Sequence, residues 1–169
     1  MRDEIKGKVW KFGDDINTDI IFPGKYTYTI SDPGEMAKHA LEDADPGFAS
    51  RVQKDDIIVA GRNFGCGSSR EQAALCLKAA GVGAVVAKSF ARIYFRNAIN
   101  LGLSIAVCPD LSDAVKAGDE ITILFSQGII RHQGRDYPFP PLPEEVARIL
   151  DAGGLIEYVK AKITKEKKA

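Results

Sequence analysis

Three short apolar runs alternate with two helix-like segments between residues 56 and 108, and this alternation constrains the fold more than any other feature. The runs DIIVAG (56–61), AVVAKSF (84–90) and LSIAVC (103–108) are rich in β-branched residues, as buried strands are. SREQAALCLKAAG (69–81) and FARIYFRNAINLG (90–102) show helical periodicity and end in glycine. A β-α-β-α-β order predicts parallel strands joined by crossover helices.

The segments before and after this unit predict a different arrangement. We expect a strand over residues 6–12 and a short amphipathic helix over 34–43. Residues 118–139 contain two turn signals, Gln127-Gly128 and Gln133-Gly134, which favour an antiparallel hairpin or meander. Two helices, split at Gly153-Gly154, are expected to end the chain.

Together these elements predict the α/β class, with an antiparallel β extension and C-terminal helices. The 169 residues suffice for one domain with a sizeable core and are too few for two comfortable ones. We therefore expect a single domain over residues 1–169, with its core at about 6–163 and a frayed basic tail at 164–169.

The charge balance and the cysteines exclude several classes of function. Lys+Arg and Asp+Glu are both 23, which argues against a nucleic-acid partner. No apolar run approaches the roughly 20 residues needed to span a bilayer, so we expect no membrane contact. The start of the chain lacks the apolar core of a secretory signal, which favours a cytoplasmic protein. Three cysteines without a C-x-x-C pair predict no zinc site, no disulfide framework and no iron–sulfur cluster on this chain.

The glycine-rich stretch GRNFGCGSSREQAA (61–74) has two interpretations. In the first, Ser68 and Glu71 form a capping box at the start of the next helix. In the second, the stretch is a ligand site, because open α/β sheets bind ligands beyond the carboxyl ends of their strands. Gly65 and Gly67 would let the backbone approach a ligand, and Arg70 would offer a planar fork to a carboxylate.

The chemistry that this loop could perform is limited by its spacing. It matches neither G-x-x-x-x-G-K-[ST] nor G-x-G-x-x-G, so a small carboxylate is a better ligand than a nucleotide. A serine could act as a base there only if N–H groups and positive charge stabilised its alkoxide. No histidine lies nearby in the sequence, which argues against a Ser-His-Asp hydrolase.

GCGSSREQAA (65–74) and AVVAKSFARIYFRNAINLGL (84–103) resemble the mobile C-terminal domain of the aconitase superfamily. More closely, they resemble the small subunits of the isopropylmalate dehydratase and homoaconitase group. KVWKFGDDINTDIIFPGKY (8–26) supports the same resemblance, which covers roughly residues 6 to 163. The motifs G-S-S-R-E, D-x-N-T-D and K-S-F-A-R-I are specific in combination. The resemblance implies a single swivelling β/β/α domain.

The resemblance also implies a two-part hydro-lyase. A separate large subunit would carry a [4Fe–4S] cluster, in a heterodimer or heterotetramer, and this chain would bind no metal or cofactor itself. Ser68 matches the family's catalytic base, which takes a proton from the carbon next to a carboxylate of a hydroxy-acid substrate. Ser69 and Arg70 match contacts to substrate carboxylates, and Thr18 and Asp19 match a segment beside the substrate. Gly65, Gly67, Ser89 and Arg92 match positions that support the pocket, although Ser89 and Arg92 also fit a helix cap and a surface arginine.

The loop at residues 25–29 is expected to face the variable end of the substrate. Many subunits of this group carry Tyr-Leu-Arg there, whereas this chain has Lys25, Tyr26, Thr27, Tyr28 and Thr29 and no arginine. Tyrosine and threonine offer apolar faces and neutral hydroxyls, which suit an alkyl group. A distal carboxylate would need a cation, and Lys25 is the only one in the loop.

Several functions therefore remain open from the sequence. Isopropylmalate is the first choice of substrate, followed by homoaconitate-type acids and methylated malates. A non-catalytic carboxylate-binding module is the alternative from another class, and a domain whose S-x-x-E is only a helix cap is a third possibility.

Overall fold

The computed structural model describes residues 3–166 and consists of one seven-stranded sheet with helices on both sides. The strand order is β4-β3-β2-β1-β5-β6-β7. The strands are β1 (Glu4–Lys11), β2 (Ile57–Ala60), β3 (Ala84–Ala87), β4 (Ser104–Val107), β5 (Glu120–Leu124), β6 (Ile129–His132) and β7 (Arg135–Pro138). The helices are α1 (Thr18–Ile21), η1 (Gly24–Tyr26), α2 (Pro33–Ala37), α3 (Phe48–Arg51), α4 (Gln72–Ala79), α5 (Arg92–Leu101), α6 (Pro109–Ala114), α7 (Glu144–Asp151) and α8 (Leu155–Glu166).

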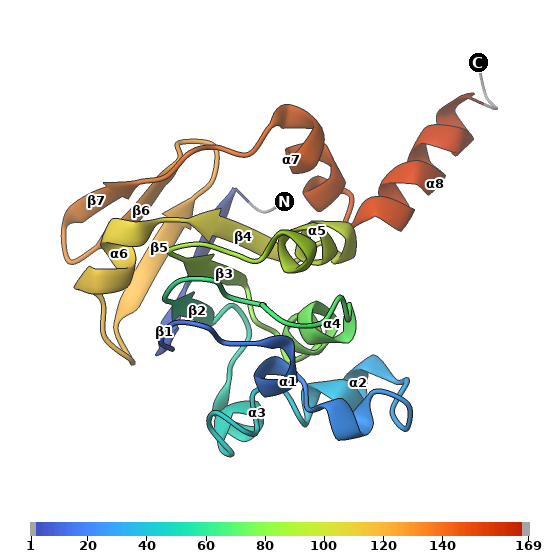
Figure 1. The fold of residues 1–169 in the computed structure, drawn as a ribbon. Helices are drawn as coiled ribbons and strands as arrows, with labels where there is room; N and C mark the ends of the chain where they lie inside the picture. The colour runs from blue at the N-terminus through green and yellow to red at the C-terminus, as the bar shows by residue number, and fades with distance from the viewer. Residues whose placement is uncertain (1–2, 167–169) are drawn as a thin grey trace.

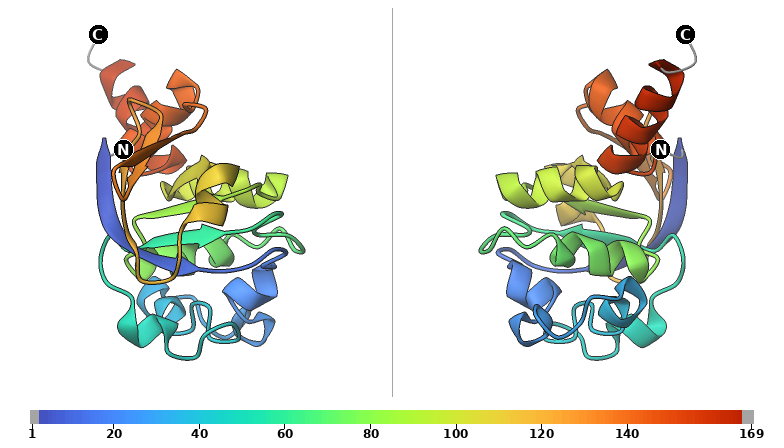
Figure 2. Two further views of the ribbon diagram at one scale, coloured as in Figure 1. Left: turned by 90° about the vertical axis from the view of Figure 1, so that its left-hand side faces the viewer. Right: turned by 90° about the vertical axis from the view of Figure 1, so that its right-hand side faces the viewer.

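Strand β1 joins a parallel half of the sheet to an antiparallel half. It pairs in parallel with β2, with Val9 opposite Ile57, and it pairs antiparallel with β5, with Ile5 opposite Ile123. Figure 2 shows β1 curving as it passes from one half to the other. The predicted parallel unit and the predicted meander are therefore both confirmed, and the sheet curls about the strand that they share.

Side-chain alternation along the parallel strands produces two hydrophobic cores. Ile58, Val85 and Ile105 face the core beneath α4 and α5, whereas their neighbours Ile57 and Val86 face the core that β5–β7 and α6 enclose. In Figure 1, α4 and α5 lie to the right of the parallel strands, and β5–β7 with α6 lie to the left. Strands covered on both faces explain why their sequences are continuously apolar.

Helices α4 and α5 lie on the same face of the sheet because the strand order runs in one direction from β1 to β4. Successive right-handed crossovers that advance in one direction place their helices on one side. Consequently the loops after β1, β2 and β3 meet at the carboxyl end of the parallel strands, on the side nearest the viewer in Figure 1. This end holds the glycine-rich stretch.

Several predicted boundaries differ from the structure. The helix expected from residue 69 begins at Gln72, and the helix expected over 34–43 is the shorter α2, which Asp32 caps. The frayed tail expected from residue 164 is helical through Glu166, and residues 167–169 lie outside the described residues. The split between the last two helices at Gly153-Gly154 is confirmed. Among the described residues, no helix is both long and apolar enough to cross a membrane.

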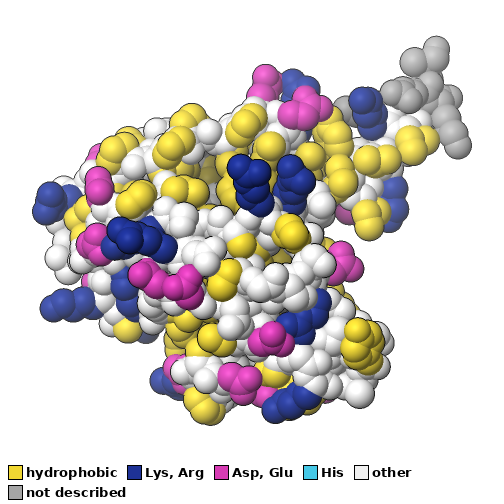
Figure 3. Space-filling model, viewed as in Figure 1, with side chains coloured by type: hydrophobic (Ala, Val, Ile, Leu, Met, Phe, Trp, Pro, Cys, Tyr) yellow, Lys and Arg dark blue, Asp and Glu magenta, His cyan; other side chains and the backbone are white. Residues whose placement is uncertain are grey.

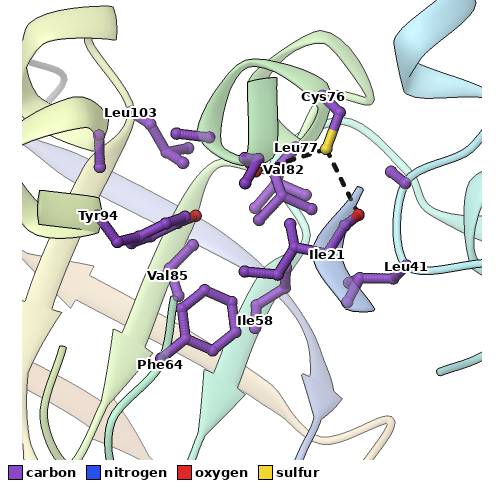
Figure 4. Close-up of a cluster of buried hydrophobic side chains, with 14 of the residues drawn as sticks. Ile21, Leu41, Ile58, Phe64, Cys76, Leu77, Val82, Val85, Tyr94 and Leu103 are labelled. Atoms are coloured by element: carbon purple, nitrogen blue, oxygen red, sulfur yellow. Dashed lines mark hydrogen bonds between the residues drawn. The ribbon is translucent and has the colours of Figure 1, made fainter. Parts of the chain in front are cut away.

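Tyr94 is the largest fully buried side chain of the core beneath α4 and α5. Figure 4 shows its hydroxyl pointing among aliphatic side chains that include Val85 and Leu103. This hydroxyl has no hydrogen-bond partner among the described residues. Burial raises the pKa of Tyr94 well above its usual range, so the hydroxyl stays neutral and carries only the cost of its desolvation.

We expect Tyr94→Phe to stabilise the protein, because it removes a buried polar atom without opening a cavity. The free energy of unfolding should rise by about 1 kcal/mol, which for a domain of this size raises Tm by about 2–4 °C. Thermal unfolding measures the change. Tyr158→Phe is the matched control, because the Tyr158 hydroxyl donates to Glu145 Oε1 at 2.8 Å and its loss should not stabilise. A fall in Tm for Tyr94→Phe would contradict this account.

Candidate active site

The glycine-rich loop after β2 is tied to the loops that follow its two neighbouring strands. On the β1 side, Gly65 N–H donates to the Ile16 carbonyl at 2.7 Å, and Thr18 N–H donates to the Cys66 carbonyl at 2.8 Å. On the β3 side, Phe64 N–H donates to the Ser89 carbonyl at 3.0 Å. The three loops therefore lie side by side in the same order as their strands. The backbone of the glycine-rich loop is held by hydrogen bonds on both sides.

Gly65 and Gly67 are required by the backbone conformation of the loop. Their φ angles are +77° and +97°, in the left-handed region that side chains other than glycine seldom adopt. Gly65 has a second reason to be glycine, because a Cβ there would lie 2.1 Å from Cγ of the Tyr94 ring. At Gly67 the nearest atom, Thr18 Oγ1, would be 3.4 Å away.

Side chains of the segment Asn17-Thr18-Asp19 make two hydrogen bonds to backbone N–H groups, one within α1 and one to the glycine-rich loop. Asn17 caps α1 by accepting from Ile20 N–H at 2.9 Å. Thr18 Oγ1 accepts from the backbone N–H of Ser68 at 3.1 Å. The Thr18 residue is only 1% exposed, so it lies behind the loop as a support. The substrate contact predicted for Thr18 would require this buried side chain to become accessible.

Ser68 is exposed and accepts hydrogen bonds at Oγ from a single neighbour, Arg70. The guanidinium Nε donates to it at 3.0 Å, and the backbone N–H of Arg70 donates at 3.3 Å. The capping box predicted for Ser68 and Glu71 is wrong, because Glu71 itself occupies the N-cap position of α4 and makes no side-chain cap bond. The donors to Ser68 thus come from an arginine and from its amide, and not from a helix terminus.

The Arg70 guanidinium donates hydrogen bonds to side chains from two other segments of the chain. Its Nη2 donates to Asp19 Oδ1 at 2.6 Å, and its Nη1 donates to Thr27 Oγ1 at 2.9 Å. A guanidinium has five N–H groups, and these contacts with Ser68, Asp19 and Thr27 use three of them, which leaves two for a ligand. Gly24 makes room for the arrangement, because a Cβ there would lie 2.7 Å from Asp19 Oδ1. Sequence reasoning missed Gly24, whose only signal was its place after Pro23 in a turn-rich segment.

Side chains of the loop at residues 25–29 contact either the site or the segment that contains His39 and Glu42. Thr27 reaches Arg70, whereas Lys25 pairs with Glu42 at 3.0 Å and lies over the Tyr26 ring. The Tyr26 ring packs on His39, with ring centroids 4.0 Å apart. Tyr28 is 98% exposed at the tip of the loop, and Thr29 Oγ1 lies near the loop's own carbonyls. The one cation of the loop is therefore already neutralised within the chain.

The predicted supporting residues Ser89 and Arg92 have separate positions. Ser89 Oγ accepts from Asn63 N–H at 2.9 Å and so fixes the start of the glycine-rich loop, while the N-cap position of α5 belongs to Ala91. Arg92 is exposed and lines a hollow next to Ser89. Asn97, which sequence reasoning missed, donates from Nδ2 to the Ser69 carbonyl at 3.0 Å. No local sequence signal pointed to Asn97, because its partner is 28 positions away.

The chain does not assemble a metal site from the residues that the structure describes. No three His, Cys, Asp or Glu side chains come together there. Burial raises the pKa of the Cys76 and Cys108 thiols, which disfavours the thiolate that a metal needs. Cys66 is half-buried in the glycine-rich loop, between its two positive-φ glycines.

Comparison with known proteins shows the family to which the chain belongs. The family described as aconitase C-terminal domain matches residues 15–107. The chain is 54% identical over 162 residues to 3-isopropylmalate dehydratase small subunit 1 of Methanopyrus kandleri, with 95% of each chain covered. It is 52% identical over 163 residues to the 3-isopropylmalate dehydratase small subunit of Caldicellulosiruptor bescii, with 95% of this chain and 98% of the relative covered.

A solved structure shows the same fold. The crystal structure of 3-isopropylmalate dehydratase (leuD) from Methanocaldococcus jannaschii superposes with a TM-score of 0.91 at 44% sequence identity. The match covers 98% of this chain and 99% of that one. The fold predicted from the resemblance is thereby confirmed over nearly the whole chain.

We expect Gly65→Ala to destabilise the protein more than Gly67→Ala. Both substitutions place a side chain at positive φ, which costs roughly 1–2 kcal/mol. Only the Gly65 substitution also drives a methyl group into the Tyr94 ring, and such overpacking costs about a further 1–3 kcal/mol. Denaturant or thermal unfolding of both variants measures the difference. Equal losses would show that the Tyr94 contact does not constrain the loop.

Proposed function

The chain belongs to the aconitase C-terminal-domain family, and from this premise we propose that it is the small subunit of a 3-isopropylmalate dehydratase. The observation that carries the proposal is the exposed Ser68 hydroxyl, which Arg70 supplies with two hydrogen bonds. These are the donors that a serine needs to act as a base, because they favour its alkoxide.

In the proposed reaction, Ser68 takes the proton from the carbon next to a carboxylate of 2-isopropylmalate and later delivers a proton to the carbon that lost the hydroxyl. Hydroxyl leaves from the neighbouring carbon, and water adds back in the opposite regiochemistry to give 3-isopropylmalate. Arg70 serves two purposes, because its Nε stabilises the Ser68 oxygen while its two remaining N–H groups can hold a substrate carboxylate. Asp19 and Thr27 keep the guanidinium in the plane that both purposes need.

The hydroxyl group needs help to leave, which a Lewis acid can give. We propose that a separate large subunit carries a [4Fe–4S] cluster, which when bound would draw off the hydroxyl as a Lewis acid. The small subunit then contributes the base and the substrate-binding side chains, and the pair forms the complete site. On this proposal the isolated chain is inactive.

The loop at residues 25–29 favours an alkyl group over a third carboxylate at the variable end of the substrate. Lys25 is neutralised by Glu42, so it leaves no free positive charge in the loop. Thr27 and the exposed Tyr28 present neutral groups. A buried carboxylate without a cation is costly, whereas an isopropyl group gains from contact with aromatic and methyl surfaces. Isopropylmalate is therefore a better substrate for this chain than homoaconitate.

We expect Ser68→Ala to lower kcat by about 10²–10⁴-fold with the fold intact, the usual contribution of a general base. The measurement is the isomerisation of 2-isopropylmalate by the chain reconstituted anaerobically with its large subunit. Ser69→Ala is the matched control, since it removes the adjacent hydroxyl and should cost less. Near-normal turnover by Ser68→Ala would remove the serine from its role. Activity of this chain alone would overturn the two-subunit proposal. Substrate binding without turnover by the reconstituted pair would instead favour a carboxylate-binding module.

We expect Glu42→Gln to broaden the substrate preference, because it removes the charge that neutralises Lys25. In the reconstituted enzyme, kcat/KM for homoaconitate should rise relative to kcat/KM for isopropylmalate. The double variant Glu42→Gln/Lys25→Met should lose this gain, which separates the released cation from other effects at Glu42. An unchanged ratio in Glu42→Gln would mean that Lys25 cannot reach the variable end of the substrate.

A further inference from the structure

Two arginines on α5 lie close together and have no ionic partner in the described part of the chain. Arg92 and Arg96 are four residues apart on one side of the helix, and both are exposed. Neither has an ion pair or a side-chain hydrogen bond among residues 3–166, whereas Arg51, Arg131 and Arg148 each contact a carboxylate at 3.1 Å or less. Arg62 and Arg135 have no ion pair among those residues either, but Arg92 and Arg96 share one side of a helix.

The position of the pair is unfavourable for the helix that carries it. Arg92 is the first residue of α5, where the positive end of the helix dipole repels a cation. Like charges four residues apart on a helix also repel each other. No acidic residue in the first turn compensates. Because the pair weakens its own helix, its role is to be sought outside this chain.

The surroundings of the pair are apolar. Arg92 and Arg96 line a hollow of about 440 Å³ together with Phe90, Phe95, Val107 and Ser89. Ile93, on the same helix, is 50% exposed. Figure 3 shows two basic side chains next to each other among hydrophobic ones over α5. Arginines set among aromatic and aliphatic side chains are typical of protein–protein interfaces, where the apolar groups give contact area and the guanidinium groups bind carboxylates.

This surface is continuous with the proposed active site. Asn97, one residue after Arg96, donates to the Ser69 carbonyl. At the other edge of the hollow, the Ser89 carbonyl accepts from Phe64 in the glycine-rich loop. A protein seated on the hollow would therefore be held beside Ser68 and Ser69. The proposed two-subunit enzyme needs a binding surface at this place, because its base and its Lewis acid would lie on different chains.

We propose that the α5 surface, defined as Phe90, Arg92, Ile93, Phe95 and Arg96, docks the large subunit. The matching surface of the large subunit presents Asp or Glu carboxylates to the two guanidinium groups and an apolar side chain to the hollow. This inference rests on the proposed function, which supplies the partner. The unpaired guanidinium groups indicate an acidic surface on the large subunit. The hydrogen bond from Asn97 to the Ser69 carbonyl places this surface beside the proposed active site.

The test measures the Kd of the anaerobically purified large subunit for the full-length chain, without substrate, at two salt concentrations. Arg92→Glu/Arg96→Glu should raise Kd by about 100-fold or more, because each guanidinium that meets a carboxylate is replaced by a like charge. The wild-type Kd should rise with salt, and that of Arg92→Lys/Arg96→Lys should stay nearer to wild type. Arg131→Glu/Arg135→Glu, on β6 and β7, makes the same change in net charge and should leave Kd within a few-fold. Circular dichroism and Tm confirm that each variant is folded.

Saturation with the large subunit distinguishes docking from a role in substrate binding. At saturating large subunit, the single variant Arg96→Glu should recover most of the wild-type kcat with little change in KM. An unchanged Kd, or a normal Kd with a raised KM, would overturn the docking surface. Failure of the proposed function has a different signature, in which the wild-type chains associate normally but the complex does not isomerise isopropylmalate.

Discussion

The contact between Gly65 and the Tyr94 ring is the constraint on which the site depends. It presses the glycine-rich loop onto the most buried aromatic side chain of α5, so the loop is as well positioned as the core beneath it. The neighbouring backbone hydrogen bonds to Ile16 and Ser89 then fix its orientation between two other loops. A loop packed in this way gives up its conformational entropy when the domain folds, and not when the substrate binds.

Arg70 connects this loop to side chains from two other segments of the chain. One guanidinium contacts the Ser68 hydroxyl, the Asp19 carboxylate and the Thr27 hydroxyl, which come from three separate segments of the chain. Because each contact restricts a planar group, the three together fix the direction in which its remaining N–H groups point. Preorganised donors of this kind need not reorganise as charge develops during a reaction.

The sequence predicted those features that depend on neighbouring residues. Apolar runs of four residues and helical periodicity were enough for the parallel unit, and the paired turn signals were enough for the meander. The start of α4 was missed because Ser68 is held by Thr18 and Arg70 instead of capping a helix. The roles of Thr18, Gly24 and Asn97 could not be read locally, since each depends on a partner more than 25 positions away or on space that another loop must occupy. The pairing of Lys25 with Glu42 was missed because the two residues lie in different segments of the chain.

The loop at residues 25–29 has a consequence for how such a protein can change. Thr27 is its one side-chain link to Arg70, and the remaining side chains turn to His39 and Glu42 or to the exterior. Substitutions at the other loop positions therefore leave Ser68 and its donors in place. If this loop faces the variable end of the substrate, as proposed, a duplicated copy of the gene can accumulate changes there while Ser68 and its donors are preserved. On this proposal, the reaction and the choice of substrate depend on different parts of one small domain and can evolve separately.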